Sequence, residues 1–386
     1  MRAEFLPFHL PDIDDAEIRS VEETLRSGWL TSGPKVMEFE HQFAEFVGAR
    51  HAIAVNSCTA ALHLALDAIG LNERDEVLVP TLTFAATAEV VFYFHARPVL
   101  VDCCRKTLNI DPEAIERAIT ARTRAIIPVH FAGQPCDMDN IRDIAQRHSL
   151  AVIEDAAHAL PAQYRGQMVG TIGDITCFSF YATKTITTGE GGMITTDNDE
   201  YAERMRIMRL HGISNNAWKR YAAEGSWRYD ILFPGYKYNL TDIAAALGVE
   251  QLKKCWRFHA TRKRLAQMFD RAFADTTAIA VPFVNQGVEH AWHLYVIQLD
   301  LDQLTINRDC FISELKRANV GSSVHFIPLH LHPFYRDTLH SNAAEYPCAT
   351  RAYERIISLP LYTRMSAQDQ QDVIDAVLEI VERHQR

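Results

Sequence analysis

Between about residues 50 and 200, short runs of apolar and β-branched residues alternate with segments of helical periodicity. The helical segments follow residues 58, 111 and 137. Continuous apolar strands separated by helices are typical of a mainly parallel sheet covered on both faces. This pattern predicts an α/β architecture in which ligands bind at the carboxyl ends of the strands. The expected strands are residues 52–55, 77–80, 98–102, 125–129, 150–155, 175–180 and 192–197.

The rest of the chain differs from this region in its composition and in its pattern of apolar residues. Residues 198–213 predict a long helix that leaves the sheet. Residues 214–235 are polar, aromatic and basic, and we interpret them as a functional loop whose aromatic side chains can pack. A helix from residue 241 then leads into a smaller unit. We therefore expect a large domain over 1–250, with an N-terminal arm, and a small domain over 251–386, which has strands at 292–300 and 322–326 and helices at 308–318 and from about 366.

Charge and cysteine usage exclude several classes of protein. The 386 residues contain 39 Lys and Arg against 49 Asp and Glu, which gives a net charge of −10. A chain that mainly grips nucleic acid or an anionic membrane is normally basic, so we expect neither partner. The eight cysteines form no CxxC pair, which fits a reduced compartment. No signal peptide or transmembrane run is evident, and we expect a cytoplasmic protein.

The segment IEDAAHA, residues 153–159, ends an apolar strand with a carboxylate. Asp155 suits a pyridinium nitrogen, which needs a buried counter-ion. One alternative is a carboxylate that caps the following turn. Another is a metal site made by Glu154, Asp155 and His158, but adjacent residues of a strand point to opposite faces.

The segment FSFYATKTITTGEGG, residues 178–192, holds Lys184 among weakly charged neighbours. A lysine in such a turn can have a lowered pKa, which a Schiff-base amine requires. The alternative is a solvated loop lysine. Ser179 adds a hydroxyl and the GEGG turn permits close backbone approach.

A third segment, residues 55–66, passes directly from a strand into a helix through Ser57, Cys58 and Thr59. Free N–H groups at a helix start bind phosphate well. The alternative is a plain helix cap.

Two further clusters have competing interpretations. His325, His330 and His332 lie close together, but their spacing fits no zinc pattern, and we favour surface or substrate-contacting imidazoles over a metal site. The loop that holds Trp218, Lys219, Arg220, Tyr221, Trp227, Arg228 and Tyr229 resembles a single-strand nucleic-acid platform in composition. Because of the net charge, we favour a flap over an anionic small molecule.

The order of residues 57–59, residues 154–158, Ser179 and Lys184 resembles that of the DegT/DnrJ/EryC1/StrS aminotransferases. These are pyridoxal-phosphate enzymes that act on nucleotide-linked keto sugars. Among them, the chain is most similar to sugar C4 aminotransferases such as those that make UDP-4-amino-4-deoxy-L-arabinose. The resemblance also covers SGWLTSGP (27–34), PTLTFAAT (80–87), IIPVHFAGQPCDM (126–138), PGYKYNLTD (234–242) and SLPLY (358–362).

The resemblance implies an aspartate aminotransferase-like fold of type I, with a mainly parallel central sheet and a smaller C-terminal α+β domain. It implies that Lys184 forms a Schiff base with pyridoxal phosphate, that Asp155 holds the pyridinium proton and that His158 contacts the ring hydroxyl. The other implied cofactor contacts are Phe84 on the ring face, Ser57, Cys58, Thr59 and Ser179 at the phosphate, and Asn239 from the other subunit of a homodimer. The expected substrate contacts are Thr31, Arg228, Tyr229, His325 and His330.

Cys58 departs from the commoner Ser-Gly-Thr or Ser-Ala-Thr form of the family, although the backbone donors survive this change. The implied reaction moves an amino group from L-glutamate to the C4 ketone of a UDP-linked keto sugar by ping-pong kinetics. A sugar dehydratase of the same fold is an alternative, but those relatives replace the Schiff-base lysine with His. A second alternative is a non-catalytic protein that binds a sugar nucleotide.

Overall fold

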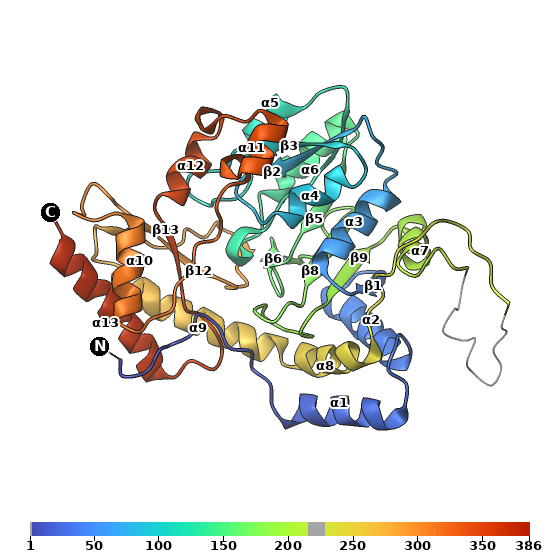
Figure 1. The fold of residues 1–386 in the computed structure, drawn as a ribbon, viewed down its shortest axis with the longest axis horizontal. Helices are drawn as coiled ribbons and strands as arrows, with labels where there is room; N and C mark the ends of the chain where they lie inside the picture. Colours follow the sequence, from blue (N-terminus) through green and yellow to red (C-terminus); the bar gives the residue numbers. More distant parts are fainter. Residues whose placement is uncertain (1, 215–227) are drawn as a thin grey trace.

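A seven-stranded sheet forms the centre of the computed structural model, which describes residues 2–214 and 228–386 (Figure 1). The strand order is β1-β9-β8-β5-β4-β2-β3. Only β9 runs antiparallel to its neighbours, so the predicted, mainly parallel α/β sheet is confirmed. The strands are β1 His51–Val55, β2 Glu76–Pro80, β3 Arg97–Val101, β4 Thr123–Ile126, β5 Ala151–Asp155, β8 Ile175–Ser179 and β9 Gly192–Thr196.

Helices cover both faces of this sheet, because its strands carry apolar side chains on both sides. One face packs against α2 Pro34–Val47, α5 Pro112–Ala118, α6 Met138–His148 and α8 Asp242–Lys253. The other packs against α3 Cys58–Ala68, α4 Ala86–Phe92, α7 Asp199–Met208 and α11 Pro333–Leu339. Outside these layers, α1 Asp15–Ser27 lies on α8 (Figure 1).

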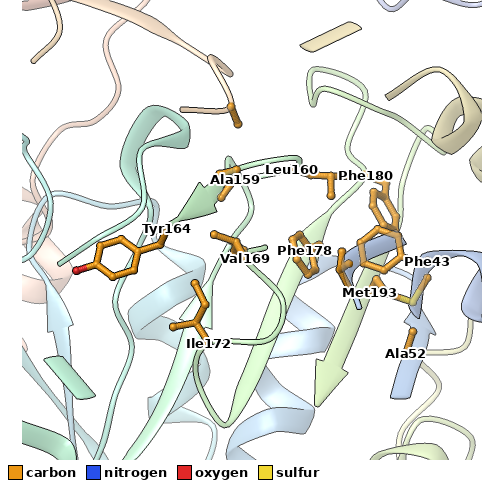
Figure 2. Packing of buried hydrophobic residues seen from close by; sticks show 14 of the residues in the cluster. Phe43, Ala52, Ala159, Leu160, Tyr164, Val169, Ile172, Phe178, Phe180 and Met193 are labelled. Atoms are coloured by element: carbon orange, nitrogen blue, oxygen red, sulfur yellow. The ribbon is translucent and has the colours of Figure 1, made fainter. Parts of the chain in front are cut away.

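An aromatic cluster joins α2 to the sheet, and Figure 2 shows its rings close together. Phe43 packs edge-on against Phe178 and Phe180, with ring centroids 5.1 and 5.6 Å apart.

We expect Phe43→Ala to lower the free energy of unfolding by about 3–5 kcal/mol, because it leaves a cavity. Urea unfolding measures this loss. Phe334→Ala, at a side chain that is 57% exposed, is the control, and an equal loss in both variants would contradict the prediction.

A second, three-stranded sheet has the order β10-β12-β13 and is antiparallel. It packs against α9, α10 and α13, and Leu6 of the N-terminal segment lies in the same core. The predicted boundary at residues 250 and 251 falls inside α8, and the division into two domains stays a prediction. The elements here are α9 Cys255–Phe273, β10 Ile279–Ala280, β12 Tyr295–Leu299, α10 Arg308–Arg317, α12 Pro347–Tyr353, β13 Ile356–Leu359 and α13 Ala367–His384.

Two expected elements differ from the structure. The predicted strand over 322–326 is wrong, since only Ser323 pairs with a neighbour, in an isolated bridge to Ser358. The predicted helix over 198–213 ends at Met208, because the backbone turns to positive φ at His211 (57°) and Gly212 (66°). A Cβ on Gly212 would lie 1.9 Å from the carbonyl oxygen of Phe233.

Among residues 2–214 and 228–386, no helix has the length and apolar composition that a membrane span requires. The aromatic and basic residues predicted between 218 and 227 lie outside the described residues. The remaining elements are η1 Phe131–Gly133, η3 Leu329–Leu331, η4 Ala343–Glu345 and a small sheet of β6 Gln163–Tyr164, β7 Gln167–Met168 and β11 Val288–Glu289.

Candidate functional site

A cavity of about 470 Å³ opens where the parallel strands end. Residues that directly follow or end β1, β2, β5 and β8 line it, as expected for ligand sites of α/β sheets. It therefore brings together segments that are far apart in the sequence. The predicted residues in its wall are Ser57, Cys58, Thr59, Phe84, Asp155, His158, Ser179, Lys184 and His325.

Asp155 is the last residue of β5 and is 5% exposed. The hydroxyl of Thr87 donates a hydrogen bond to Oδ2 at 2.8 Å, and the backbone N–H of Ala157 donates to Oδ1 at 3.2 Å. Burial raises the pKa of Asp155, while these two donors and the Lys184 amine lower it. A fixed carboxylate of this kind suits a cationic ring nitrogen that enters the cavity.

Glu154 points away from the cavity, as the alternation of a strand requires. Its side chain accepts hydrogen bonds from Thr176 at 2.7 Å and from the backbone N–H of Gly173 at 2.8 Å. It also contacts His130 at 2.9 Å. Among the described residues, no group of three or more His, Cys, Asp or Glu side chains is placed to hold a metal ion.

Lys184 lies in the turn that follows β8, with its side chain in the cavity wall. Burial lowers its pKa to about 8, although Cys58 and Asp155 act in the opposite direction. A larger share of its amine is therefore neutral near pH 7 than for an exposed lysine, whose pKa is about 10.4. A neutral amine is the form that attacks a carbonyl carbon.

The start of α3 forms another part of the cavity wall. Ser57 is the N-cap, and its hydroxyl accepts a hydrogen bond from the N–H of Ala60 at 3.1 Å. The N–H groups of Cys58 and Thr59 have no acceptor within the helix, as in any first turn. Burial raises the pKa of the Cys58 thiol far above its usual value, so this residue is no nucleophile. The arrangement suits a phosphate group.

Comparison with known proteins assigns the chain to a family. The model of the DegT/DnrJ/EryC1/StrS aminotransferase family matches residues 11–378. The chain belongs to this family. It is 53% identical to the protein MJ1066 of Methanocaldococcus jannaschii, over 99% of each chain. It is 51% identical to the spore coat polysaccharide biosynthesis protein SpsC of Bacillus subtilis, over 98% of each.

Solved structures of this family share the fold. The sugar aminotransferase Spr1654 of Streptococcus pneumoniae in its PMP form has a TM-score of 0.92 at 35% identity, over 98% of this chain and 99% of that one. Its PLP form has a TM-score of 0.91. The expected fold type I is thus confirmed for this aminotransferase.

Pyridoxal phosphate is the cofactor of this aminotransferase. The cavity fits it, because a buried carboxylate, a half-buried lysine and a helix start line one space. The Nδ1 atom of His158 is buried and has no hydrogen-bond partner, as expected for a group that waits for a ligand. When bound, this cofactor carries the amino group between the two substrates and withdraws electrons from the reacting carbon.

The lowered pKa of Lys184, about 8, predicts how cofactor uptake depends on pH. The rate should rise with pH below about 8 and level off above it, because only the neutral amine reacts. Mixing apoprotein with pyridoxal phosphate and following visible absorbance from about pH 6 to about pH 10 measures this. A rate that still rises steeply near pH 10 would contradict the prediction, since it is the behaviour of a solvated lysine.

The structure also places in the cavity residues that sequence reasoning missed. His293 lies beside His158, with ring centroids 4.4 Å apart, and Phe326 stacks on His158 at 5.9 Å. The sequence HAWH before β12 contains His293. Whether this side chain points into the cavity depends on segments that are distant in the chain. The other missed lining residues are Leu62, Thr83, Ala86, Val129, Ala157, Tyr181, Thr183, Glu190 and Gly191.

His330, a predicted substrate contact, lies outside the cavity lining. Its ring is buried between the hydroxyls of Thr81 and Thr350, at 2.7 and 3.0 Å, and stacks on Tyr346. Burial lowers its pKa to about 4. The structure therefore gives this histidine a packing role.

Four other predicted residues also lie outside this chain's cavity lining, namely Thr31, Arg228, Tyr229 and Asn239. The amide nitrogen of Asn239 donates to Ser32 Oγ at 2.7 Å, and its amide oxygen accepts from Lys237 Nζ at 2.6 Å. Thr31 accepts a backbone hydrogen bond from Asp242 at 3.3 Å. A role for these residues in catalysis requires another subunit or a substrate that extends beyond the cavity.

Proposed function

We propose that the protein transfers an amino group from L-glutamate to the C4 ketone of a UDP-linked keto sugar. The observation that carries the proposal is the pair of Lys184 and Asp155 in one cavity, with the aspartate buried and the lysine half-buried. A protein that merely binds a sugar nucleotide needs neither group. The relative SpsC, which is named for polysaccharide biosynthesis, and the named sugar aminotransferase Spr1654 support a sugar as acceptor. The preference for UDP and for C4 rests on the sequence resemblance.

In this proposal, each cofactor-facing residue has one task. Lys184 Nζ would remove the proton from the donor carbon and, as the protonated amine, deliver it to the cofactor carbon on the other side of the transferred nitrogen. Asp155 keeps a proton on the ring nitrogen, and His158 donates to the ring hydroxyl. Phe84, which is 62% exposed, covers the ring face. The phosphate group is bound by Ser57, Cys58, Thr59 and Ser179.

We also propose that two copies share the active site. Among the described residues, Lys184 is the only lysine or arginine in the cavity lining, and it is already assigned to proton transfer. A doubly charged phosphate then needs further donors, and Asn239 of a second copy would supply one. Thr31, Arg228, Tyr229 and His325 stay proposed substrate contacts. Size-exclusion chromatography with light scattering tests the dimer, and a monomer with full activity would contradict it.

Product analysis tests the reaction itself. The holoenzyme is incubated with L-glutamate and a UDP-linked 4-keto sugar, and mass spectrometry follows both substrates. We expect an amino sugar and one equivalent of 2-oxoglutarate. A product that loses oxygen without gaining nitrogen would indicate a dehydratase. A protein that binds no cofactor and converts nothing would indicate a non-catalytic relative.

A further inference from the structure

The cavity contains few groups that can receive the carboxylate of an amino donor. Every α-amino acid brings a carboxylate to the reacting carbon. Among the described residues that line the cavity there is no arginine, and the one lysine, Lys184, is the proposed base. The acidic lining residues, Asp155 and Glu190, would repel a carboxylate. The remaining groups that can carry positive charge are the imidazoles of His158, His293 and His325.

Two of these imidazoles form a pair with unused hydrogen-bonding atoms. The rings of His158 and His293 lie with centroids 4.4 Å apart, and the Nδ1 atom of each is buried without a partner. His325 differs, because its Nδ1 is 2.8 Å from Ser358 Oγ. A buried polar atom without a partner costs free energy unless a ligand engages it. Because His158 is assigned to the cofactor, the unpartnered Nδ1 of His293 is better placed than His325 to hold a further polar group.

The backbone that carries His293 is held firmly. Arg262 is 1% exposed, and its Nη1 donates to the carbonyl oxygens of Trp292, His293 and Leu361 at 3.3, 3.2 and 2.7 Å. Trp292 has a positive φ of 53°, which is uncommon for a large side chain. Backbone of this kind persists where the surroundings fix it, and it concentrates at functional sites. The position of His293 is thus built into the fold.

We propose that His293, with His158 beside it, receives the α-carboxylate of the amino donor and takes up a proton as the donor binds. This inference rests on the proposed aminotransfer, and it adds the group that recognises the donor. The imidazole of His293 would take the place of the arginine guanidinium that commonly binds a carboxylate. The proton that His293 takes up then balances the negative charge of the donor's carboxylate.

Electrostatics explain why the proton arrives with the donor. Burial lowers the pKa of His293 well below its usual value, and the neighbouring His158, Lys184, Arg262 and His325 lower it further. The imidazole is therefore neutral before the donor binds. A carboxylate in contact favours the charged form and raises the pKa again. The other titratable groups of the lining are Asp155, Glu190, Cys58 and Tyr181.

The donor half-reaction of the holoenzyme tests the inference without a sugar. Stopped-flow absorbance follows the loss of the visible cofactor band with each amino acid that reacts. We expect H293Q to raise the donor KM about tenfold or more at pH 7 with little change in the limiting rate. Cofactor affinity, measured by dialysis, should stay unchanged. The KM ratio of variant to wild type should be largest at low pH and shrink as pH rises, because the proton on His293 is lost.

Controls separate this inference from the proposed function. His41 is exposed on α2, so H41Q should behave as wild type. If H293Q folds poorly, H293A with added imidazole should recover a low donor KM. A KM that H293Q leaves unchanged, or a ratio independent of pH, would overturn the inference alone. A wild-type holoenzyme that reacts with no amino acid would overturn the proposed function and the inference together.

Discussion

Replacing Lys184 with alanine is expected to abolish the visible absorbance of the holoenzyme and to lower the transamination rate by about 10²–10⁴-fold or more. Lys184 is half-buried, the pKa of its amine is lowered to about 8, and it is the only lysine of the described cavity lining. No other side chain there can both attack the cofactor carbonyl and carry a proton between the two carbons. Absorbance spectra and product formation measure the two effects separately.

The control for this variant is Lys316→Ala, at an exposed position of α10. It should leave the spectrum and the rate unchanged, and both proteins should unfold at similar temperatures. A Lys184→Ala protein that transaminates at the wild-type rate would refute the assigned role of Lys184. A Lys184→Ala protein that loses transamination activity but also unfolds at a much lower temperature than the control would indicate a folding defect instead.

Replacing Asp155 with asparagine is expected to lower kcat by about 10²–10³-fold and to weaken cofactor binding. The amide has almost the same shape as the carboxylate and can still accept from the N–H of Ala157, but it carries no charge. The ring nitrogen would then lose the anion that keeps it protonated. Steady-state kinetics at saturating cofactor isolate the effect on kcat.

Asp139, whose side chain is 46% exposed on α6, provides the matched control. Asp139→Asn should leave kcat and cofactor binding unchanged. The visible spectrum gives a second readout for Asp155→Asn, since loss of the ring proton changes the absorbance of the bound cofactor. Wild-type kcat and spectrum in Asp155→Asn would contradict the assignment. The result is independent of which sugar is the acceptor.

The sequence predicted the strands of the central sheet well, for a physical reason. Strands that are buried on both faces are continuously apolar, and the short length of runs such as 52–55 and 175–180 favours strands over longer helices. Strand ends then locate ligand-binding side chains, and Asp155 and Ser57 were found in this way. Their meeting in one cavity confirms the placement, while their roles stay predictions.

Other features depend on contacts that no local pattern encodes. Five histidines lie just before β12 or between residues 325 and 332. Nothing in their spacing distinguishes His330, buried between two threonines, from His293, which lines the cavity. The facing of His293 depends on Arg262, 31 positions earlier in the chain. The strand expected over 322–326 failed likewise, since its only partner is Ser358.

The single antiparallel strand of the central sheet has a consequence for biosynthesis. β1, which delivers Ser57 to the cavity, pairs in the sheet with β9 alone among the described strands, and β9 ends at Thr196. As the ribosome releases the chain from its N-terminus, β1 therefore has no sheet partner until Gly192, which pairs with Val55 and lies 137 residues later (192 − 55), has emerged. The cofactor's phosphate end is thus completed late, by a contact of long sequence separation, which is slow to form. A nascent chain that stops before β9 should bind no cofactor, however well its parallel strands have already associated.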